Sequence, residues 1–511
     1  MTNPTVKNII MITSDQHRGD CYGFEGRSVK TPHLDKLARD GTRFNACITP
    51  NLVCQPARAS ILTGLLPLTH GVRDNGIDLP LETGQRGFAG SLSKAGYDTG
   101  IIGKAHLSTH HTFAKTGRPE CQFSQPDFPA SWGGPYMGFE HVELMVEGHN
   151  YWLPAAPPSG LHHSQWHYND GLGEERNRLY SKDLGPSSGA PQTFNSALPV
   201  AWHNSTWVGD RTIEYLRQER EKPFFLWASF ADPHHPFDCP EPWSRLHHPD
   251  DVDLPRHRTT DFDRRPWWHR ASMESTPSGS AEVRALRQNF SRIPTQPDNA
   301  LRHIIANYYG MISLIDHQVG RIRKALHEYG LDDNTLIVFT SDHGDWMGDH
   351  GLMLKGPMAY EGVLRVGMIW AGPGVKADQV VKDPVSTLDL ASTFTDYGNA
   401  QNQGPMHGRS LRPFLEGTEA SRDFAYSEWD VAASRCGVEL KLRTARTQDW
   451  KLTLELNSGA GELYCLKDDP DEMQNLFNCA DYSAAQAELT EMIHSRPDDA
   501  LKTPLQPSGI A

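Results

Sequence analysis

Residues 51–64 read Asn-Leu-Val-Cys-Gln-Pro-Ala-Arg-Ala-Ser-Ile-Leu-Thr-Gly, and the rest of the chain is organised around them. The stretch puts Cys54, Pro56 and Arg58 at fixed offsets, directly before a run, 59–62, that can open a helix. A cysteine at a helix N-terminus lies at the positive end of the backbone dipole, where a sulfur or oxygen anion is stabilised. Position alone leaves two interpretations of Cys54 open: a reactive group, or a buried structural cysteine, which is the commoner kind.

The spacing Cys54-x-Pro56-x-Arg58, followed by the Leu-Thr-Gly of residues 62–64, resembles the signature of the type I sulfatase family of the alkaline phosphatase superfamily. In that family the cysteine is oxidised to formylglycine by a formylglycine-generating enzyme. The resemblance implies that Cys54 is modified in this way and becomes the nucleophile. It also implies an alkaline-phosphatase-like α/β fold and an arylsulfatase-like activity.

Length and charge restrict the class of protein. A chain of 511 residues exceeds the size at which one hydrophobic core stops growing, so we expect one large domain and a smaller one. No apolar run approaches the ~20 residues that a membrane span needs. The net charge of −14 repels nucleic acid and anionic membranes. An anionic substrate would therefore need a local cluster of positive charge.

The start of the chain and the cysteines bear on its compartment. Residues 1–7 carry no apolar signal core and lead straight into an apolar strand, so we expect a cytoplasmic protein. The cysteines are scattered without C-x-x-C pairs, which argues against a zinc ribbon and against a dense disulfide framework. They stand at positions 21, 47, 54, 121, 239, 436, 465 and 479.

The first part of the chain alternates apolar strands with helical patterns, which is typical of an α/β fold with a mostly parallel sheet flanked by helices. Strands are predicted over 8–12, 97–103, 223–230 and 335–340, and helices over 31–39, 209–220 and 301–329. We assign residues 1–417 to this catalytic domain. Two long segments without clear periodicity, 107–200 and 238–300, are expected to form the walls of a substrate pocket.

The pattern changes beyond residue 418. Short alternating segments over 438–444, 450–456 and 461–466 predict antiparallel strands, and a last helix is expected near 485–494. Residues 418–511 are therefore predicted to form a small α+β domain with an antiparallel sheet. Members of the sulfatase family typically end in such a domain.

Polar side chains follow two of the predicted strands. Asp15 and Gln16 come after the first strand, and Asp342 and His343 come after the late one. In open α/β sheets, sites form at the carboxyl ends of the strands. Either aspartate alone could cap a turn. Together with residue 54 the two carboxylates, the imidazole and the amide oxygen of Gln16 predict a site for one divalent metal ion, Ca²⁺ or, because imidazole is a softer ligand, Mn²⁺.

Basic side chains follow the other strands. Lys104 and His106 come after the strand that ends at residue 103, His234 follows the next strand, and Lys355 lies further on. Each alone could be a solvated side chain. Together they supply the positive cluster that a tetrahedral oxyanion requires in an acidic protein. In the sulfatase family, Gly-Lys-x-His, Pro-His-x-Pro and a lysine ahead of an arginine-containing strand line the sulfate pocket, so the resemblance implies this role here.

The resemblance also implies individual roles. Asp342 would ligate the metal and take a proton from the formylglycine diol, which Arg58 would hold. Lys104 and Lys355 would bind the ester oxygens as point charges. His234, with Lys355, would protonate the leaving alcohol, and His106 would deprotonate the second hydroxyl so that sulfate is released.

Two departures from the family pattern affect the predicted substrate. Many sulfatases have a second aspartate at the place of Gln16 and an asparagine at the place of His343; the forms found here are more similar to phosphonate monoester hydrolases and choline sulfatases. Lys104 and His106, in contrast, are the sulfatase form. Since the pocket contacts the substrate, we give its residues more weight than those of the metal site.

Three functions are therefore compared. The first is hydrolysis of a sulfate monoester, of an aryl or small organic alcohol. The second keeps the nucleophile but acts on phosphonate monoesters or phosphodiesters. The third is a non-catalytic relative that binds an anion with Cys54 unmodified. Histidine- and tryptophan-rich segments, 162–167 and 266–269, could stack on a substrate ring or only pack. By family resemblance a homodimer or homotetramer is expected.

Overall fold

The strand β1 (Asn8–Ser14) is buried along its whole length and lies in the interior of a large sheet. A computed structural model describes residues 7–146, 161–418 and 420–510. Within these residues the sheet has eight strands in the order β11-β2-β10-β9-β1-β7-β3-β5. Besides β1 they are β2 (Thr42–Ile48), β3 (Asp98–Gly103), β5 (His141–Leu144), β7 (Phe224–Ser229), β9 (Thr335–Ser341), β10 (Arg365–Ala371) and β11 (Gln379–Ser386).

All neighbouring strands of this sheet pair in parallel except at β10, which is antiparallel to both β2 and β9. The predicted mixed, mostly parallel α/β sheet is thus confirmed. The four predicted strands correspond to β1, β3, β7 and β9. Their near-continuous apolar runs are typical of strands that are covered on both faces.

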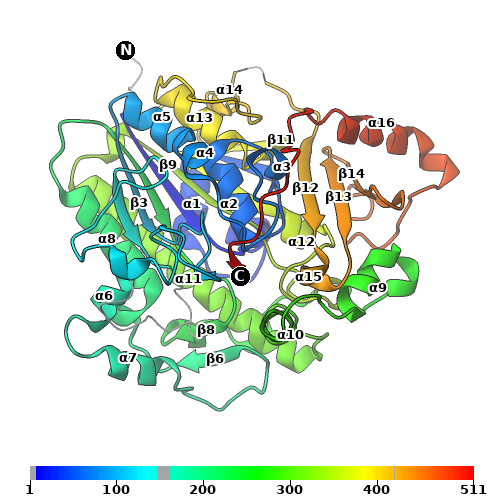
Figure 1. Ribbon diagram of the computed structural model, residues 1–511, viewed down its shortest axis with the longest axis horizontal. Helices are drawn as coiled ribbons and strands as arrows, with labels where there is room; N and C mark the ends of the chain where they lie inside the picture. Colours follow the sequence, from blue (N-terminus) through cyan, green and yellow to red (C-terminus); the bar gives the residue numbers. More distant parts are fainter. Residues whose placement is uncertain (1–6, 147–160, 419, 511) are drawn as a thin grey trace.

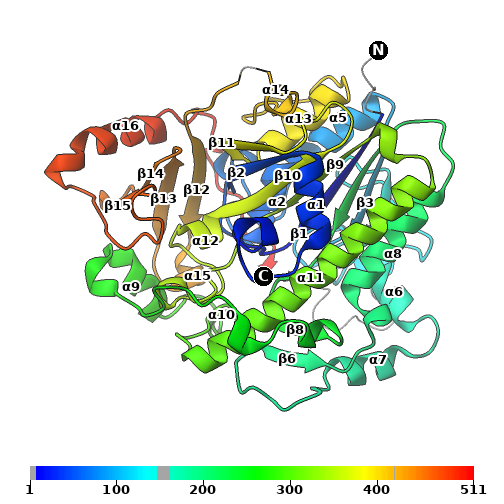
Figure 2. The same ribbon diagram turned by 180° about the vertical axis from the view of Figure 1, so that it is seen from behind.

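Helices cover both faces of the sheet (Figures 1 and 2). One face carries α2 (Cys54–Thr63), α5 (Phe88–Lys94) and α13 (Asp389–Tyr397), whose apolar side chains pack with Ile9 and Met11 of β1. The other face carries α1 (Pro32–Asp40), α8 (Asn204–Arg217) and α11 (Asp298–Glu328), which pack with Ile10 and Ile12. Alternate residues of β1 therefore serve two separate cores.

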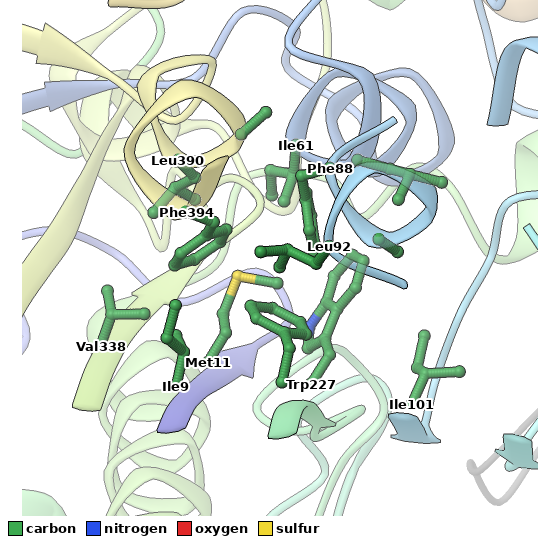
Figure 3. Packing of buried hydrophobic residues seen from close by; sticks show 14 of the residues in the cluster. Ile9, Met11, Ile61, Phe88, Leu92, Ile101, Trp227, Val338, Leu390 and Phe394 are labelled. Atoms are coloured by element: carbon green, nitrogen blue, oxygen red, sulfur yellow. The ribbon is translucent and has the colours of Figure 1, made fainter. Parts of the chain in front are cut away.

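The core beneath α2 and α5 includes the aromatic rings of Phe88, Trp227 and Phe394 (Figure 3). Phe88 packs against Phe225 and Phe394 with ring centroids 4.7 and 5.0 Å apart, and Ile61 of α2 lies in the same cluster. This packing fixes α2 against the sheet, and with it the position of Cys54 at the start of that helix.

Three predicted helices, α2, α8 and α11, begin earlier in the structure than expected. The helix predicted over 209–220 is α8, which begins at Asn204 because the side chain of His203 accepts a hydrogen bond from the backbone N–H of Ser205. The helix expected to open at residue 59 begins at Cys54. The helices predicted over 31–39 and 301–329 are α1 and α11.

The two segments expected to be loops contain short elements. β5 forms the edge of the large sheet, so part of the segment 107–200, interpreted from the sequence as a loop insertion, is a strand. These elements are too short to give a periodic pattern that could be recognised in the sequence. The others are β4 (His111–Thr112), α6 (His163–Tyr168), α7 (Gly173–Tyr180), β6 (Thr193–Ser196), β8 (Phe237–Pro240), α9 (Trp267–Glu274) and α10 (Ala281–Asn289). Residues 1–6 and 147–160 lie outside the described part.

The C-terminal region forms a separate antiparallel sheet of β12 (Ala425–Val431), β13 (Leu440–Arg446), β14 (Trp450–Glu455) and β15 (Ala460–Cys465), with α16 (Ser483–His494) packed on it. The predicted α+β architecture is confirmed, although β12 was not expected. The last strand, β16 (Gly509–Ile510), pairs with β4 of the large domain. The end of the chain thus returns to the catalytic domain (Figure 1).

Two further observations concern the whole of the described chain. All eight cysteines are free. Among the helices described, none is both long and apolar enough to cross a membrane.

Candidate active site

Cys54 is the first residue of α2 and is almost completely buried. Its Sγ lies 3.0 Å from Nζ of Lys355, 3.1 Å from Nε2 of His343 and 3.6 Å from Oδ1 of Asp15. The motif around it has a structural reason as well: Gly64 takes φ of 68° at the C-terminus of α2 and donates its N–H to the carbonyl of Ser60. The signature therefore encodes a short, buried helix with the cysteine at its N-terminus.

Arg58 lies one helical turn after Cys54, on the same face of α2, and is fully buried. Its guanidinium joins the ends of four strands of the large sheet. Nε donates to Oδ2 of Asp342 (2.8 Å), Nη2 to Oδ2 of Asp15 (3.2 Å), and Nη1 to the carbonyl of Lys104 (2.8 Å) and Oγ of Ser229 (2.9 Å). Arg58 thus fixes both aspartates relative to the cysteine.

Four buried side chains could hold a metal ion. Asp15, Cys54, Asp342 and His343 each offer a ligand atom, and these atoms all lie within 4.8 Å of one another. Two carboxylates and an imidazole are donors that Ca²⁺ and Mn²⁺ accept, whereas a thiolate would favour softer metals. The donor set fits the predicted ion once an oxygen stands at residue 54 in place of sulfur.

Gln16, the further predicted ligand, faces the same group of residues. Its Oε1 accepts a hydrogen bond from Nζ of Lys355 (2.9 Å), and its Nε2 donates to Oδ2 of Asp345 (2.5 Å). Its backbone N–H donates to Oδ1 of Asp342 (3.1 Å). The amide oxygen is therefore directed toward the cluster, and its role as a metal ligand stays a prediction.

The charges of the site differ strongly from those of free side chains. Burial raises the pKa of the Cys54 thiol, but the positive charges of Lys355, His343 and Lys104 outweigh it and hold that pKa well below its usual value. Burial also opposes the ionisation of Asp15, yet Lys104, His234 and Arg58 lower its pKa. The site thus stabilises an anion at residue 54.

Asp342 differs from Asp15. Burial and the neighbouring charge of Asp15 raise the pKa of Asp342, even though Arg58 contacts it. Of the two carboxyls, Asp342 is the one that more readily accepts a proton. This agrees with the role that the family resemblance implies for it.

The predicted basic residues surround Cys54. Lys104 forms an ion pair with Oδ2 of Asp15 at 2.6 Å, and Nζ of Lys355 lies 2.9 Å from Nε2 of His234. Burial and Lys355 lower the pKa of His234 to about 4, so its imidazole is neutral at pH 7. His106 lies within hydrogen-bond reach of the Cys54 thiol. All the predicted site residues are therefore brought together, including those from distant parts of the chain.

Three residues to which the sequence gave no role support this cluster. Asp345 accepts hydrogen bonds from Gln16 and from the backbone N–H of Met347 and Leu354, so it holds the loop that ends at Lys355. Ser229, at the end of β7, binds Arg58. His235 stacks on His234 with centroids 4.1 Å apart. Their positions at strand ends and beside predicted site residues are the signals that could have identified them.

A pocket leads to Cys54, and both loop segments contribute to its walls. The first supplies Ser108, His110, His111, Glu120 and Val146, and the second supplies Leu286, Arg287, Phe290 and Ser291. Both segments thus contribute to the walls of the pocket at Cys54, and its use by a substrate stays a prediction. The aromatic-rich segments 162–167 and 266–269 do not line this pocket; His163 and Trp268 are buried in packing, where Trp268 donates to the carbonyl of Pro357.

Addition of Ca²⁺ or Mn²⁺ to metal-free protein is expected to raise its Tm. An ion that binds only the folded state stabilises it by about 2.7 kcal/mol at a hundredfold excess over Kd. The shift should disappear in His343→Ala, while Asp250→Asn, at an exposed position, should keep it. Scanning calorimetry with and without each ion measures the shift, and an equal rise in His343→Ala would contradict the assigned ligands.

The model of the Sulfatase family matches residues 7–400, which include every residue of this site. The chain belongs to the sulfatase family. A second family description, N-sulphoglucosamine sulphohydrolase, C-terminal, matches residues 348–498 of the same chain. The fold and the family are those of sulfuric ester hydrolases.

Individual sulfatases and their relatives resemble the chain over nearly its whole length. An arylsulfatase from Clostridium perfringens is 29% identical over 503 residues, which are 93% of this chain and 91% of the relative. The crystal structure of a phosphonate monoester hydrolase of Agrobacterium radiobacter superposes with a TM-score of 0.74 at 26% identity, covering 96% and 95% of the two chains. A phosphonate monoester hydrolase from Silicibacter pomeroyi has the same fold, with a TM-score of 0.79 at 24% identity, covering 98% and 97%.

Proposed function

We propose that this sulfatase hydrolyses sulfate monoesters of aryl or small organic alcohols to the alcohol and sulfate, with formylglycine at position 54 and one divalent ion, Ca²⁺ or Mn²⁺. One observation carries the proposal: Cys54 opens a buried helix and is surrounded by the metal-ligand cluster and by Lys104, His106, His234 and Lys355. The identity to an arylsulfatase supports it.

The two absent groups would supply the nucleophile and part of the positive charge. A formylglycine aldehyde hydrates to a diol, whose two hydroxyls serve in turn for attack on sulfur and for release of sulfate. Asp15, Asp342, His343 and Gln16 would hold the divalent ion, which would lower the pKa of a hydroxyl at residue 54 and offset negative charge.

The basic residues of the pocket act on the ester itself. Lys104 and Lys355 bind its non-bridging oxygens and stabilise the charge that grows on them in the transition state. Nζ of Lys355 also contacts His234. We assign to this contact the transfer of a proton to the oxygen of the leaving alcohol. Because His234 is neutral, its Nε2 can accept a hydrogen bond from Nζ of Lys355.

Three residues act on the nucleophile. Arg58 holds its position and offsets its charge, and Asp342, whose pKa is raised, accepts the proton that the attacking hydroxyl loses. His106, within reach of residue 54, takes the proton of the second hydroxyl so that sulfate leaves and the aldehyde is restored. Water then needs no direct access to the crowded sulfur centre.

Peptide mass and sulfate release test the proposal together. The protein is produced with a formylglycine-generating enzyme, and the tryptic peptide 44–58 is analysed; Cys47 in the same peptide is the internal control. We expect residue 54 to be converted, Cys47 to stay intact, and sulfate to be released from 4-nitrophenyl sulfate. An unconverted Cys54, together with no hydrolysis of any monoester, would favour the non-catalytic alternative.

Lys104→Ala is expected to lower kcat/KM for an aryl sulfate by about 10²- to 10³-fold, because a preorganised charge on the reacting group is removed. The loss should be larger than that of Ser108→Ala, a neutral change in the wall of the same pocket. Steady-state kinetics with 4-nitrophenyl sulfate measures both. Equal, small effects of the two changes on kcat/KM would contradict the role of Lys104 in binding the sulfate group.

A second function is favoured by particular observations. Gln16 and His343 stand where many sulfatases have aspartate and asparagine, and the solved structure at 26% identity is a phosphonate monoester hydrolase. The alternative keeps the nucleophile and hydrolyses phosphonate monoesters or phosphodiesters. Lys104 and His106 favour sulfate.

We further propose that the protein works in the cytoplasm as a homodimer or homotetramer, with the formylglycine-generating enzyme as its maturation partner. The free state of all eight cysteines supports a reducing compartment. Light scattering of the purified protein tests the oligomeric state, and a monomer at micromolar concentration would contradict it.

A further inference from the structure

Two buried arginines line the wall of the active-site pocket. Arg287 lies on α10, and Arg435 lies on α15 (Ala433–Cys436), which packs beside α10 (Figures 1 and 2). Their exposed fractions are 7% and 8%. Neither has a role in the proposed cleavage of the ester, yet both face the same pocket as Cys54.

Among the described residues, one carboxylate, that of Asp74, forms an ion pair with either guanidinium. Arg435 forms an ion pair with Asp74, Nη1 to Oδ1, at 3.0 Å, and its guanidinium lies 5.3 Å from the ring centroid of Trp429. Within the described part of the chain, the hydrogen bond of the Arg287 guanidinium is a long contact from Nη1 to Oγ of Ser291, at 3.5 Å. Among the described residues its buried Nε has no hydrogen-bond partner.

An arginine in this situation is unusual. Buried charges are normally paired, because moving a charge out of water costs free energy that an exposed charge does not lose. Burial and the neighbouring Arg435 lower the pKa of Arg287 to about 9. The free enzyme thus holds a guanidinium that an incoming anion would stabilise.

The neighbouring lining is apolar. Leu286 on α10, Phe290 directly after that helix, and Ile510 of the C-terminal strand face the same pocket as Arg287. This combination suits a ring or short carbon skeleton that bears an anionic substituent. A guanidinium binds carboxylate or sulfate with paired N–H donors.

We propose that Arg287, with Arg435 beside it, forms a second anion subsite that binds an anionic group on the alcohol half of the substrate. The inference rests on the proposed function for the sulfate end of the pocket. It narrows the substrate class to sulfate esters of alcohols that carry a further carboxylate or sulfate. The subsite determines specificity and takes no part in bond cleavage.

Matched esters test this subsite. The probes are 4-carboxyphenyl sulfate, its methyl ester, which lacks the carboxylate charge, and the bis-sulfate of benzene-1,4-diol. Comparison of the first and third probes shows whether the subsite prefers a carboxylate or a second sulfate. The ratio of kcat/KM for a charged probe to that for the methyl ester is expected to fall about tenfold or more in Arg287→Gln. Arg287→Lys, which keeps a charge, should retain part of the ratio.

Arg284→Gln on the same helix is the matched control, because Arg284 donates to the carbonyl of Gly279 and does not line the pocket. Its ratio should equal that of the unchanged enzyme. A ratio in Arg287→Gln within about twofold of the unchanged enzyme for both charged probes would overturn the subsite.

Binding separates a failure of the subsite from a failure of the proposed function. Calorimetry on metal-loaded Cys54→Ala measures Kd for each probe without turnover. We expect a charged probe to bind about tenfold more tightly than the methyl ester, and Arg287→Gln in the same background to abolish the difference. If no probe is hydrolysed but the difference in Kd is found, the subsite is supported and the proposed sulfatase activity is contradicted. Equal affinities overturn the subsite even where hydrolysis is observed.

Discussion

Replacement of Cys54 by alanine is expected to lower kcat for an aryl sulfate by at least about 10⁴-fold, because in the proposed mechanism this residue supplies the nucleophile. The fold should persist. Cys54 is a small side chain at the start of α2, and that helix is anchored by the packing of Ile61 and by the hydrogen bonds of Arg58. Circular dichroism and the Tm of the variant should therefore stay close to those of the unchanged protein.

Cys47→Ala is the matched control for this result. Cys47 lies in the same tryptic peptide, is buried in β2 and is not part of the pocket. Its replacement should leave kcat within about a factor of two, since it loses only one buried sulfur atom. A Cys54→Ala enzyme with near-normal turnover would rule out the nucleophile, whatever the behaviour of the control.

Arg58→Met is expected to reduce stability by about 3–5 kcal/mol and to abolish turnover, because it leaves two buried carboxylates without their shared counter-charge. Arg58 contacts Asp342 at 2.8 Å and Asp15 at 3.2 Å, and all three side chains are fully buried. Urea unfolding in the absence of metal measures the loss. Metal should recover part of it, since a cation would replace some of the missing charge.

Arg86→Met is the control, because Arg86 pairs with Glu82 at the surface, where the two side chains are 59% and 78% exposed. Exposed pairs of this kind add little to stability, so no resolvable change is expected. Arg58→Lys keeps the positive charge but lacks the guanidinium, whose several N–H donors reach several partners. Its loss of stability is expected to be smaller than that of Arg58→Met. An Arg58→Met protein as stable as the unchanged protein would contradict the view that Arg58 holds the strand ends together.

The central strands could be predicted because they are buried on both faces. Residues 8–12 and 335–340 form apolar runs that admit few other structures, and β1 and β9 begin where expected. The candidate site could be predicted because functional residues cluster at the carboxyl ends of strands and because the motif around Cys54 is long. Asp15 and Asp342 lie far apart in sequence, yet the parallel pairing of β1 with β9 brings them side by side.

What could not be predicted depends on contacts between distant segments. β5 has only a few residues and becomes a strand because β3 lies beside it. Gln16 and His106 have φ values of 64° and 50°, a left-handed conformation that neither residue prefers and that the surrounding structure imposes. Arg287 lies in a segment without a recognisable motif, so its place in the wall of the pocket is known only from the structure.

The central claim is that the residues of the pocket, rather than those of the metal site, set the preference for sulfate. It is tested most directly by kcat/KM for an aryl sulfate, an aryl phosphonate monoester and an aryl phosphodiester with the same leaving group. The metal-loaded, formylglycine-containing protein is used, with Cys54→Ala as control. We predict a clear preference for the sulfate. A preference for either phosphorus ester would contradict the account and would mean that Gln16 and His343 were the better guides to the substrate.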